Sequence, residues 1–219
     1  MSIINSIDHQ DKKHIEQYYR WNANIYDYTR WAILLGRNSF KAELITYLSD
    51  DHTLAKTRNV TEIGCGTGFY LTSLASLFPD RQFIGLDTSP HMLKKAHQRV
   101  ARFSNVRLSN HFFPDHMSTN QMISPQHVIG SYVLSLNSNP ENFLQHIHKL
   151  LDSDGQLHLI DFYHSPYSFV TRWMRLHGVY FHDQILEIIQ PLFKVDTCRI
   201  HQGYGGLLTY YKMHLVKKN

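Results

Sequence analysis

The sequence has few cysteines, no long apolar run and no dense block of basic residues, and each absence excludes a class of protein. None of its 219 residues lies in a run close to the ~20 apolar residues that cross a bilayer, so we expect no transmembrane helix. Residues 1–6 lack the basic-then-apolar order of a signal peptide, so secretion is not expected. The only cysteines, Cys65 and Cys198, form neither a disulfide framework nor a zinc site, and they suit reduced thiols in the cytoplasm.

Charge and histidine content exclude two further classes. The formal net charge of +4 permits attraction to anionic surfaces, but lysine and arginine are spread out, whereas nucleic-acid binding needs local density. We therefore expect no nucleic-acid partner. Sixteen histidines suggest a metal site, yet His146 and His148 do not share a helix face, and no His-x-x-x-His or clustered Cys/His spacing occurs. The sequence predicts scattered surface histidines and no metal.

A glycine-rich turn between a β-type run and a helical pattern is the strongest positive signal. Residues 60–68 read Val-Thr-Glu-Ile-Gly-Cys-Gly-Thr-Gly. Glycine tolerates positive φ and allows a ligand to approach the backbone closely. The following helix, expected at residues 69–78, points unpaired N–H groups at the same place. The spacing differs from the Gly-x-Gly-x-x-Gly of dinucleotide-binding proteins, and the lysine of a P-loop is missing.

An acidic residue follows the next apolar run at the expected distance. Residues 82–87 end in Asp87, about 20 residues after the loop, where a strand-end carboxylate binds the hydroxyls of a ribose. Thr88-Ser89-Pro90 then starts another helix. Loop and carboxylate together predict a nucleoside-binding site.

These residues resemble a known family. Residues 60–68 and 85–93 are similar to the first two motifs of class I S-adenosylmethionine-dependent methyltransferases. The resemblance implies an α/β, Rossmann-like fold with a mostly parallel seven-stranded sheet, a C-terminal antiparallel hairpin and N-terminal covering helices. It implies S-adenosyl-L-methionine as cofactor. The roles it implies are Gly64, Gly66 and Gly68 around the methionine portion, Glu62 at its amino end and Asp87 on the ribose.

Other expected cofactor contacts are less specific. Cys65 and Thr88 lie within these two motifs, and Ser131 lies in the fourth expected strand, whose carboxyl end should open onto the cofactor. Many relatives carry an acid for the adenine amino group after the third strand, but here that acid is absent or displaced to Asp115. Asn110 or a backbone group is the expected substitute.

A second resemblance concerns the acceptor. Residues 25–31, 35–37, 131–135 and 156–162 resemble lipid head-group N-methyltransferases, especially those that methylate diacylglyceryl homoserine to make betaine lipids. This implies Tyr19 or Tyr26 near the transferred methyl group and Arg37 near a carboxylate. Tyr26, Tyr132 and Asp161 are the candidate catalytic residues. Asp161 is either a substrate-side acid or a strand-end residue paired with a neighbour. Packing against the sheet explains most of the N-terminal aromatics.

We expect one domain over residues 1–219. It comprises a helical cap (1–50), a cofactor-binding core (55–165) and substrate-side helices with a hairpin (166–219; strands at 194–202 and 207–216). Residues 165–181 form an amphipathic, aromatic and basic segment that either enters the core or rests on a membrane.

Three functions compete. The first is N-methylation of an amino head group on a lipid of the diacylglyceryl homoserine or phosphatidylethanolamine type, by a cytoplasmic protein that contacts an anionic membrane peripherally. The second is N- or O-methylation of a soluble small molecule, and the third is S-adenosylmethionine binding without catalysis. An apolar groove open to the surface would indicate a lipid acceptor, and a closed polar chamber a soluble one.

Overall fold

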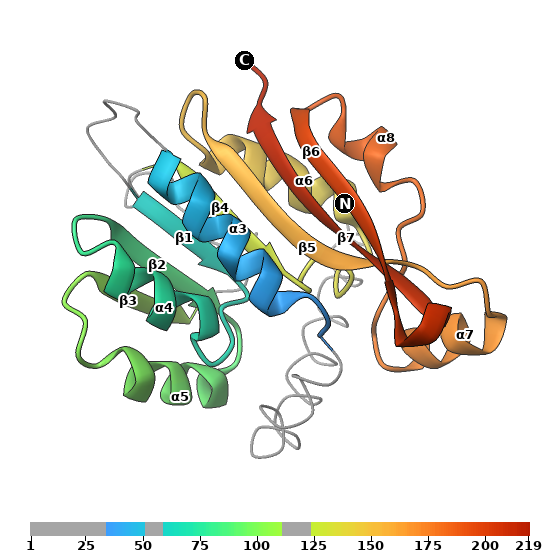
Figure 1. The fold of residues 1–219 in the computed structure, drawn as a ribbon, viewed down its shortest axis with the longest axis horizontal. Coiled ribbons are helices and arrows are strands. Elements are labelled where there is room, and N and C mark those ends of the chain that lie inside the picture. The colour runs from blue at the N-terminus through green and yellow to red at the C-terminus, as the bar shows by residue number, and fades with distance from the viewer. Residues whose placement is uncertain (1–33, 51–58, 111–123) are drawn as a thin grey trace, which may run out of the picture.

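A seven-stranded sheet organises the molecule. The computed structural model describes residues 34–50, 59–110 and 124–219, and its sheet has the strand order β3-β2-β1-β4-β5-β7-β6 (Figure 1). Strands β1 to β5 pair in parallel, and β7 lies antiparallel between β5 and β6. This confirms the mostly parallel sheet with a C-terminal hairpin. The strands are β1 (Asn59–Ile63), β2 (Gln82–Asp87), β3 (Val106–Asn110), β4 (His127–Ser131), β5 (Gln156–His164), β6 (Phe193–Gly203) and β7 (Leu208–Lys217).

Helices cover both faces of this sheet. One apolar cluster joins the sheet to α3, α4 and α5, and a second joins its other face to α6 and α8 (Figure 1). The helices are α3 (Arg37–Asp50), α4 (Phe69–Leu77), α5 (Pro90–Val100), α6 (Pro140–Leu150), α7 (Ser168–Leu176) and α8 (Ile185–Ile189), with a 3₁₀ turn η1 (Tyr204–Gly206) in the hairpin. In the described ranges none of these helices has the length and apolar character needed to cross a bilayer.

The central strands are buried on both faces. All five residues of β1 and all five of β4 are buried. Neighbouring residues of β4 serve opposite faces: Val128 packs with the α6 cluster and Ile129 with the α3 cluster. Buried parallel strands of this kind place their carboxyl ends at one edge of the sheet, where the glycine loop emerges from β1.

Helix starts follow from local capping. Ser89 and Asn139 accept the backbone N–H groups of Met92 and Asn142, and proline occupies the first turn of α5 and of α6. Helix α3 begins at Arg37. The carbonyl of Gly36 (φ +73°) accepts the Phe40 N–H and the Ser39 hydroxyl, which starts this helix.

The C-terminal helices are short. The amphipathic segment at 165–181 is helical only in α7, because Gly178 has positive φ (+72°) and the chain turns there. Helix α8 ends shortly before Pro191, which disfavours continuation of a helix.

Three histidines are buried, so the prediction of scattered surface histidines is wrong for them. His127, His158 and His214 are 0%, 0% and 3% exposed. They lie on β4, β5 and β7 and contact one another in sequence, so each imidazole finds its hydrogen-bond partner inside the protein. Because these three histidines lie on three different strands, no regular spacing along the sequence indicates that they contact one another.

Candidate functional site

The glycine loop makes the turn that its sequence requires. Gly64, Gly66 and Gly68 have φ of +69°, +55° and +79°, a region that side chains with a Cβ rarely adopt. A Cβ on Gly64 would stand 3.1 Å from Cγ2 of Val133, so the β4 exit also packs closely on the loop. Gly68 immediately precedes α4, and its carbonyl accepts the Thr72 N–H. The helix N-terminus therefore opens beside the loop.

Asp87 ties this loop to the end of β2. Its Oδ2 accepts the backbone N–H of Gly66 at 2.7 Å, and its Oδ1 accepts that of Ser89 at 2.8 Å. On the other side of the loop, Arg99 from α5 donates to the hydroxyl of Thr67 at 2.6 Å and to its carbonyl at 3.3 Å. No local pattern in the sequence predicts the Arg99 contact, because it depends on packing between α5 and the loop.

Glu62 presents a buried acceptor at the site. Only 2% of the residue is exposed, and its carboxyl group accepts the Leu71 N–H in the first turn of α4. Its Oε2 has no hydrogen-bond partner among the described residues. The pKa of Glu62 is raised to about 8, mainly by burial and to a smaller extent by Asp87, although Arg37 opposes the shift. A buried oxygen without a donor costs about 1–3 kcal/mol, so a cationic ligand with N–H groups fits here.

Arg37, the first residue of α3, brings a positive charge to the same place. Its guanidinium lies 4.1 Å from the ring centroid of Phe69 and 5.6 Å from that of Tyr70. Its Nε is buried and has no partner within the described part of the chain. An acid beside a guanidinium fits a ligand that carries both an ammonium and a carboxylate, as the methionine portion of S-adenosylmethionine does.

Tyr70 joins this group, although sequence reasoning missed it. Its ring is fully buried, its hydroxyl lies 3.3 Å from Oγ of Ser131, and burial raises its pKa to about 12. The only signal was its position two residues after the last glycine of the loop. Ser131 is thereby placed at the end of β4 facing α4, so the residues expected from β1, β2 and β4 come together at one edge of the sheet.

The other predicted cofactor residues have mainly backbone roles in the structure. Cys65 donates its N–H to the Leu86 carbonyl, while burial raises the pKa of its thiol well above the usual value. Asn110 donates its side-chain amide to the carbonyls of Asp87 and Thr88 at 3.3 and 3.1 Å. Asn110 thus fixes the β2 exit, and its contact with adenine stays a prediction. Tyr19 lies outside the described residues.

The candidate catalytic residues support the acceptor side of the site. Asp161 is buried and accepts the N–H groups of Leu134, Ser135 and Phe162 at 2.8–3.0 Å. Burial raises its pKa, and these donors oppose the shift. Of the two roles open for Asp161, the contacts favour the strand-end residue that holds its neighbours. Tyr132 (φ +54°) donates its hydroxyl to the Leu35 carbonyl at 2.6 Å, and burial raises its pKa. Tyr26 lies outside the described residues.

Comparison with known proteins identifies the central part of the chain. A family model described as "Methyltransferase domain" matches residues 61–157. This range runs from the residue before Glu62, through the glycine loop and Asp87, into β5. Residues 61–157 therefore match a methyltransferase domain.

Relatives of this methyltransferase domain act on different acceptors. Malonyl-[acyl-carrier protein] O-methyltransferase 1 of Ilyobacter polytropus is 24% identical over 157 residues, which cover 72% of this chain and 55% of that protein. The tRNA (guanine-N(7)-)-methyltransferase of Chlorobium phaeobacteroides is 35% identical over 102 residues, covering 46% of this chain and 48% of that protein. This chain spans about half the length of these curated relatives.

A solved structure shows the same fold. The phospholethanolamine N-methyltransferase 2 of Haemonchus contortus, in complex with phosphomonomethylethanolamine and S-adenosylhomocysteine, has a TM-score of 0.70 at 14% identity. The match covers 95% of this chain and 60% of that one. It extends beyond residues 61–157, so the N-terminal and C-terminal elements also belong to the methyltransferase fold.

An apolar groove lies beside the methyltransferase domain. It has a volume of about 600 Å³ and is lined by Phe162, Phe169, Val170, Trp173, Met174, Tyr204, Leu207 and Leu208. It is therefore formed by the end of β5, helix α7 and the hairpin turn η1. Phe162 connects it to the site, because its ring centroid lies 4.6 Å from that of Tyr132 and its N–H donates to Asp161. No metal-binding group of His, Cys, Asp and Glu occurs among the described residues.

Proposed function

We propose that the chain is an S-adenosylmethionine-dependent N-methyltransferase whose acceptor is the amino head group of a lipid, of the diacylglyceryl homoserine or phosphatidylethanolamine type. The apolar groove is the single observation that supports a lipid best. It is open to the surface, it is lined almost entirely by aromatic and aliphatic side chains, and Phe162 connects it to Tyr132 and Asp161. A soluble amine has no apolar part to fill such a groove.

The cofactor supplies a methyl group already activated by a sulfonium, so the protein's task is mainly to position the reactants. Glu62 and Arg37 would hold the amino and carboxylate ends of the methionine portion, and the glycine loop would admit it close to the backbone. Asp87 would hold the ribose. Asp161, by accepting three backbone N–H groups, fixes the β4 exit against which the acceptor amine would lie.

The aromatic wall between site and groove suits a cationic product. An ammonium forms as nitrogen gains the methyl group, and aromatic ring faces stabilise such a cation by about 0.5–2 kcal/mol each. Tyr132 and Phe162 are in ring contact at this wall. The structural similarity to an N-methyltransferase in complex with phosphomonomethylethanolamine also supports an amine acceptor.

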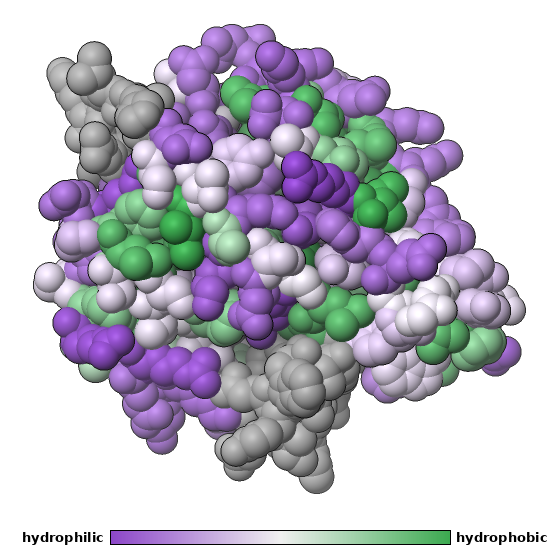
Figure 2. Space-filling view, viewed as in Figure 1, coloured by the Kyte–Doolittle hydropathy of each residue, from purple (hydrophilic) through white to green (hydrophobic). Residues whose placement is uncertain are grey.

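Helix α7 supports contact with an anionic membrane. Phe169, Trp173 and Leu176 are 65%, 53% and 78% exposed, although the residues are large and apolar. Arg172 and Arg175 alternate with them and line an adjoining surface hollow. Figure 2 shows green, hydrophobic side chains among white and pale purple ones where Figure 1 draws α7. Aromatic and basic residues on one short amphipathic helix are typical of a segment that lies in a membrane interface.

The deciding experiment measures transfer of a labelled methyl group into acceptors presented two ways. Vesicles would contain diacylglyceryl homoserine or phosphatidylethanolamine, and a parallel panel would contain water-soluble amines and hydroxyl compounds. We expect label in the lipid fraction and little in soluble acceptors. Label only in soluble acceptors would support the second function, and cofactor binding without any label would support a binding protein.

A further inference from the structure

Three buried histidines lie on adjacent strands away from the glycine loop. We call His127, His158 and His214 the histidine row. His158 and His214 are register partners across β5 and β7, and His127 lies on β4 two residues before the partner of His158. The three point to the α3 face of the sheet, opposite to Val128 and Leu215 of the α6 cluster. The proposed function uses none of them.

The row is connected by hydrogen bonds between neutral rings. His127 Nδ1 lies 3.0 Å from His158 Nε2, and His158 Nδ1 contacts His214 Nδ1. Each contact needs one proton between the two nitrogens. The Nε2 of His214 lies 3.9 Å from Oε2 of Glu43, too far for a hydrogen bond. A carboxylate repels a lone pair, so we assign the proton of His214 to Nε2, which faces Glu43. Nδ1 of His214 then accepts from Nδ1–H of His158, and Nε2 of His158 accepts from Nδ1–H of His127.

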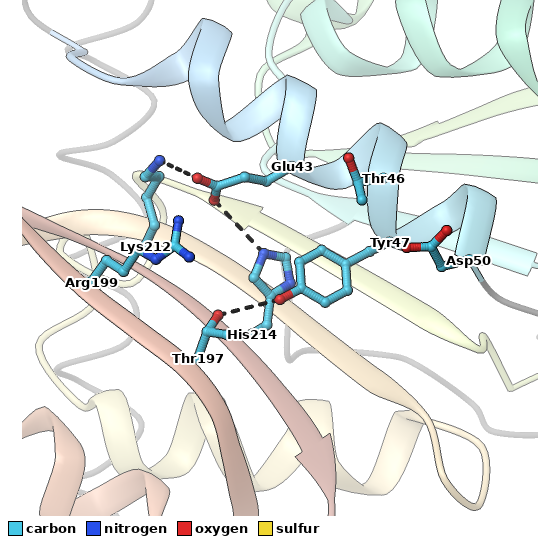
Figure 3. Close-up of a pocket in the computed structure, with 8 residues that line it drawn as sticks. All are labelled: Glu43, Thr46, Tyr47, Asp50, Thr197, Arg199, Lys212 and His214. Carbon is cyan, nitrogen blue, oxygen red and sulfur yellow. Dashed lines mark hydrogen bonds and ion pairs between the residues drawn. The ribbon is translucent and has the colours of Figure 1, made fainter.

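Helix α3 is the lid over the row. The Tyr47 ring stacks on His214 with 3.5 Å between centroids and lies 5.5 Å from His158 (Figure 3). Glu43, one turn earlier, forms an ion pair with Lys212 of β7. The rings therefore stay out of water only while α3 remains on the sheet.

The groups that face His214 do not favour its charged form. The pKa of His214 is lowered to about 3, mainly by burial and to a smaller extent by Lys212, Arg199 and His127. Burial and the two histidine neighbours lower the pKa of His158 well below its usual value. Glu43 is the nearest opposing carboxylate, but Lys212 already binds it. The charged or titratable groups around the row are Glu43, Tyr47 and Asp50 of α3, Asp196 and Arg199 of β6, Lys212 of β7, and the histidines themselves.

The same helix reaches the candidate cofactor site. Its first residue, Arg37, stands beside Phe69, Tyr70 and Glu62. Phe40 contacts both regions: its ring centroid is 5.8 Å from that of Tyr70 and 6.2 Å from that of His214. A displacement of α3 from the histidine row therefore moves Arg37 and Phe40 away from the start of α4, directly after the glycine loop.

We propose that the histidine row is an acid-sensitive latch for α3. Near pH 7 the neutral rings hold the helix on the sheet. On acidification toward pH 5, protonation of the rings favours the state in which α3 has lifted and water reaches them. Lifting removes Arg37 from the cofactor site, a step that rests on the proposed function. For a ring with an ordinary pKa near 6.5 in the lifted state, the change from pH 7 to pH 5 favours lifting by roughly 25-fold.

Hydrogen–deuterium exchange of α3 tests the latch without any cofactor. After correction for the intrinsic pH dependence of exchange, we expect the amides of residues 37–50 in the wild-type protein to exchange at least tenfold more readily at pH 5 than at pH 7. His158→Leu with His214→Phe, which leaves no titrating ring at these positions, should remove most of this rise. His97→Asn, on the exposed face of α5, is the matched control and should keep it. No rise in the wild type, or the same rise in the double variant, would overturn the proposal.

Two measurements keep the test decisive. If the double variant does not fold, histidine NMR signals of the wild-type protein replace it. Three histidine signals should not titrate until exchange of the α3 amides begins. Titration of these signals near pH 6.5 while α3 is still protected would overturn the latch.

Calorimetry with S-adenosylhomocysteine should show weaker binding at pH 5 in the wild type and less weakening in the double variant. Unchanged affinity would overturn the link to Arg37, and no binding at any pH would contradict the proposed function while the exchange result stands.

Discussion

Arg37, at the start of α3, acts electrostatically on Glu62, the penultimate residue of β1. Each has a buried polar atom without a partner in the described part of the chain, Nε of Arg37 and Oε2 of Glu62. Their charges influence each other, since Arg37 opposes the rise in the pKa of Glu62. A ligand with an ammonium and a carboxylate satisfies both atoms, which is why this pair supports the cofactor assignment.

Asp87→Ala should weaken binding of S-adenosylhomocysteine by at least about tenfold, because it removes the expected ribose acceptor and releases the Gly66 and Ser89 N–H groups. Loss of these two bonds should also lower the free energy of unfolding by about 1–3 kcal/mol. Calorimetry and urea unfolding measure the two effects. Asp80→Ala, at an exposed turn, is the control and should change neither. Unchanged affinity in Asp87→Ala would contradict the nucleoside site.

Glu62→Gln should stabilise the ligand-free protein more at pH 8 than at pH 5. The folded pKa of Glu62, about 8, lies above the ordinary value of 4.5. The stability that the protonated form contributes is therefore complete below pH 4.5 and is lost as the pH rises toward 8. The difference should reach about 4 kcal/mol at pH 8, measured by urea unfolding of both proteins.

The same residue predicts a proton release on ligand binding. A ligand ammonium beside Glu62 favours its carboxylate, so binding of S-adenosylhomocysteine at pH 7 should release up to about one proton. Calorimetry in buffers with different heats of ionisation measures this number. Glu62→Gln is the control and should release none. An equal release by both proteins would show that another group titrates.

Asp161→Asn should lower the free energy of unfolding by about 2–4 kcal/mol, because an amide N–H would then face the backbone N–H groups of Leu134, Ser135 and Phe162. Urea unfolding measures the loss. If Asp161 only positions the β4 exit, the acid limb of the pH–rate profile should keep its pKa in the variant. An unchanged stability with a shifted acid limb would instead assign proton transfer to Asp161.

Substitution of Phe169 and Trp173 by serine should reduce binding to anionic vesicles by about 10–100-fold, because both exposed rings are expected to enter the interface. Flotation or surface plasmon resonance measures it. Leu77→Ser on α4 is the matched control, since Leu77 is 54% exposed and Trp173 is 53% exposed. Higher salt should weaken binding of the wild type through Arg172 and Arg175. Equal binding by all three proteins would contradict membrane contact by α7.

Much of the fold and part of the site followed from local chemistry. The glycine loop needs residues without Cβ, Asp87 ends a buried strand, and Ser89 with Pro90 starts a helix, so these features appear in consecutive residues. The shortened helices α7 and α8 were not predicted, because an apolar stripe continues through residues where Gly178 and Pro191 end the helix.

Local sequence predicts the succession of strands and helices along the chain, the glycine loop and the carboxylate at the end of β2, since each depends on backbone conformation over a few neighbouring residues. The packing of distant segments brings the charge of Arg37 near Glu62, lets Asp161 accept three backbone N–H groups, and gathers His127, His158 and His214 in one buried row. These contacts join residues on different strands and helices, and their spacing along the chain is set by the sheet order rather than by any local period.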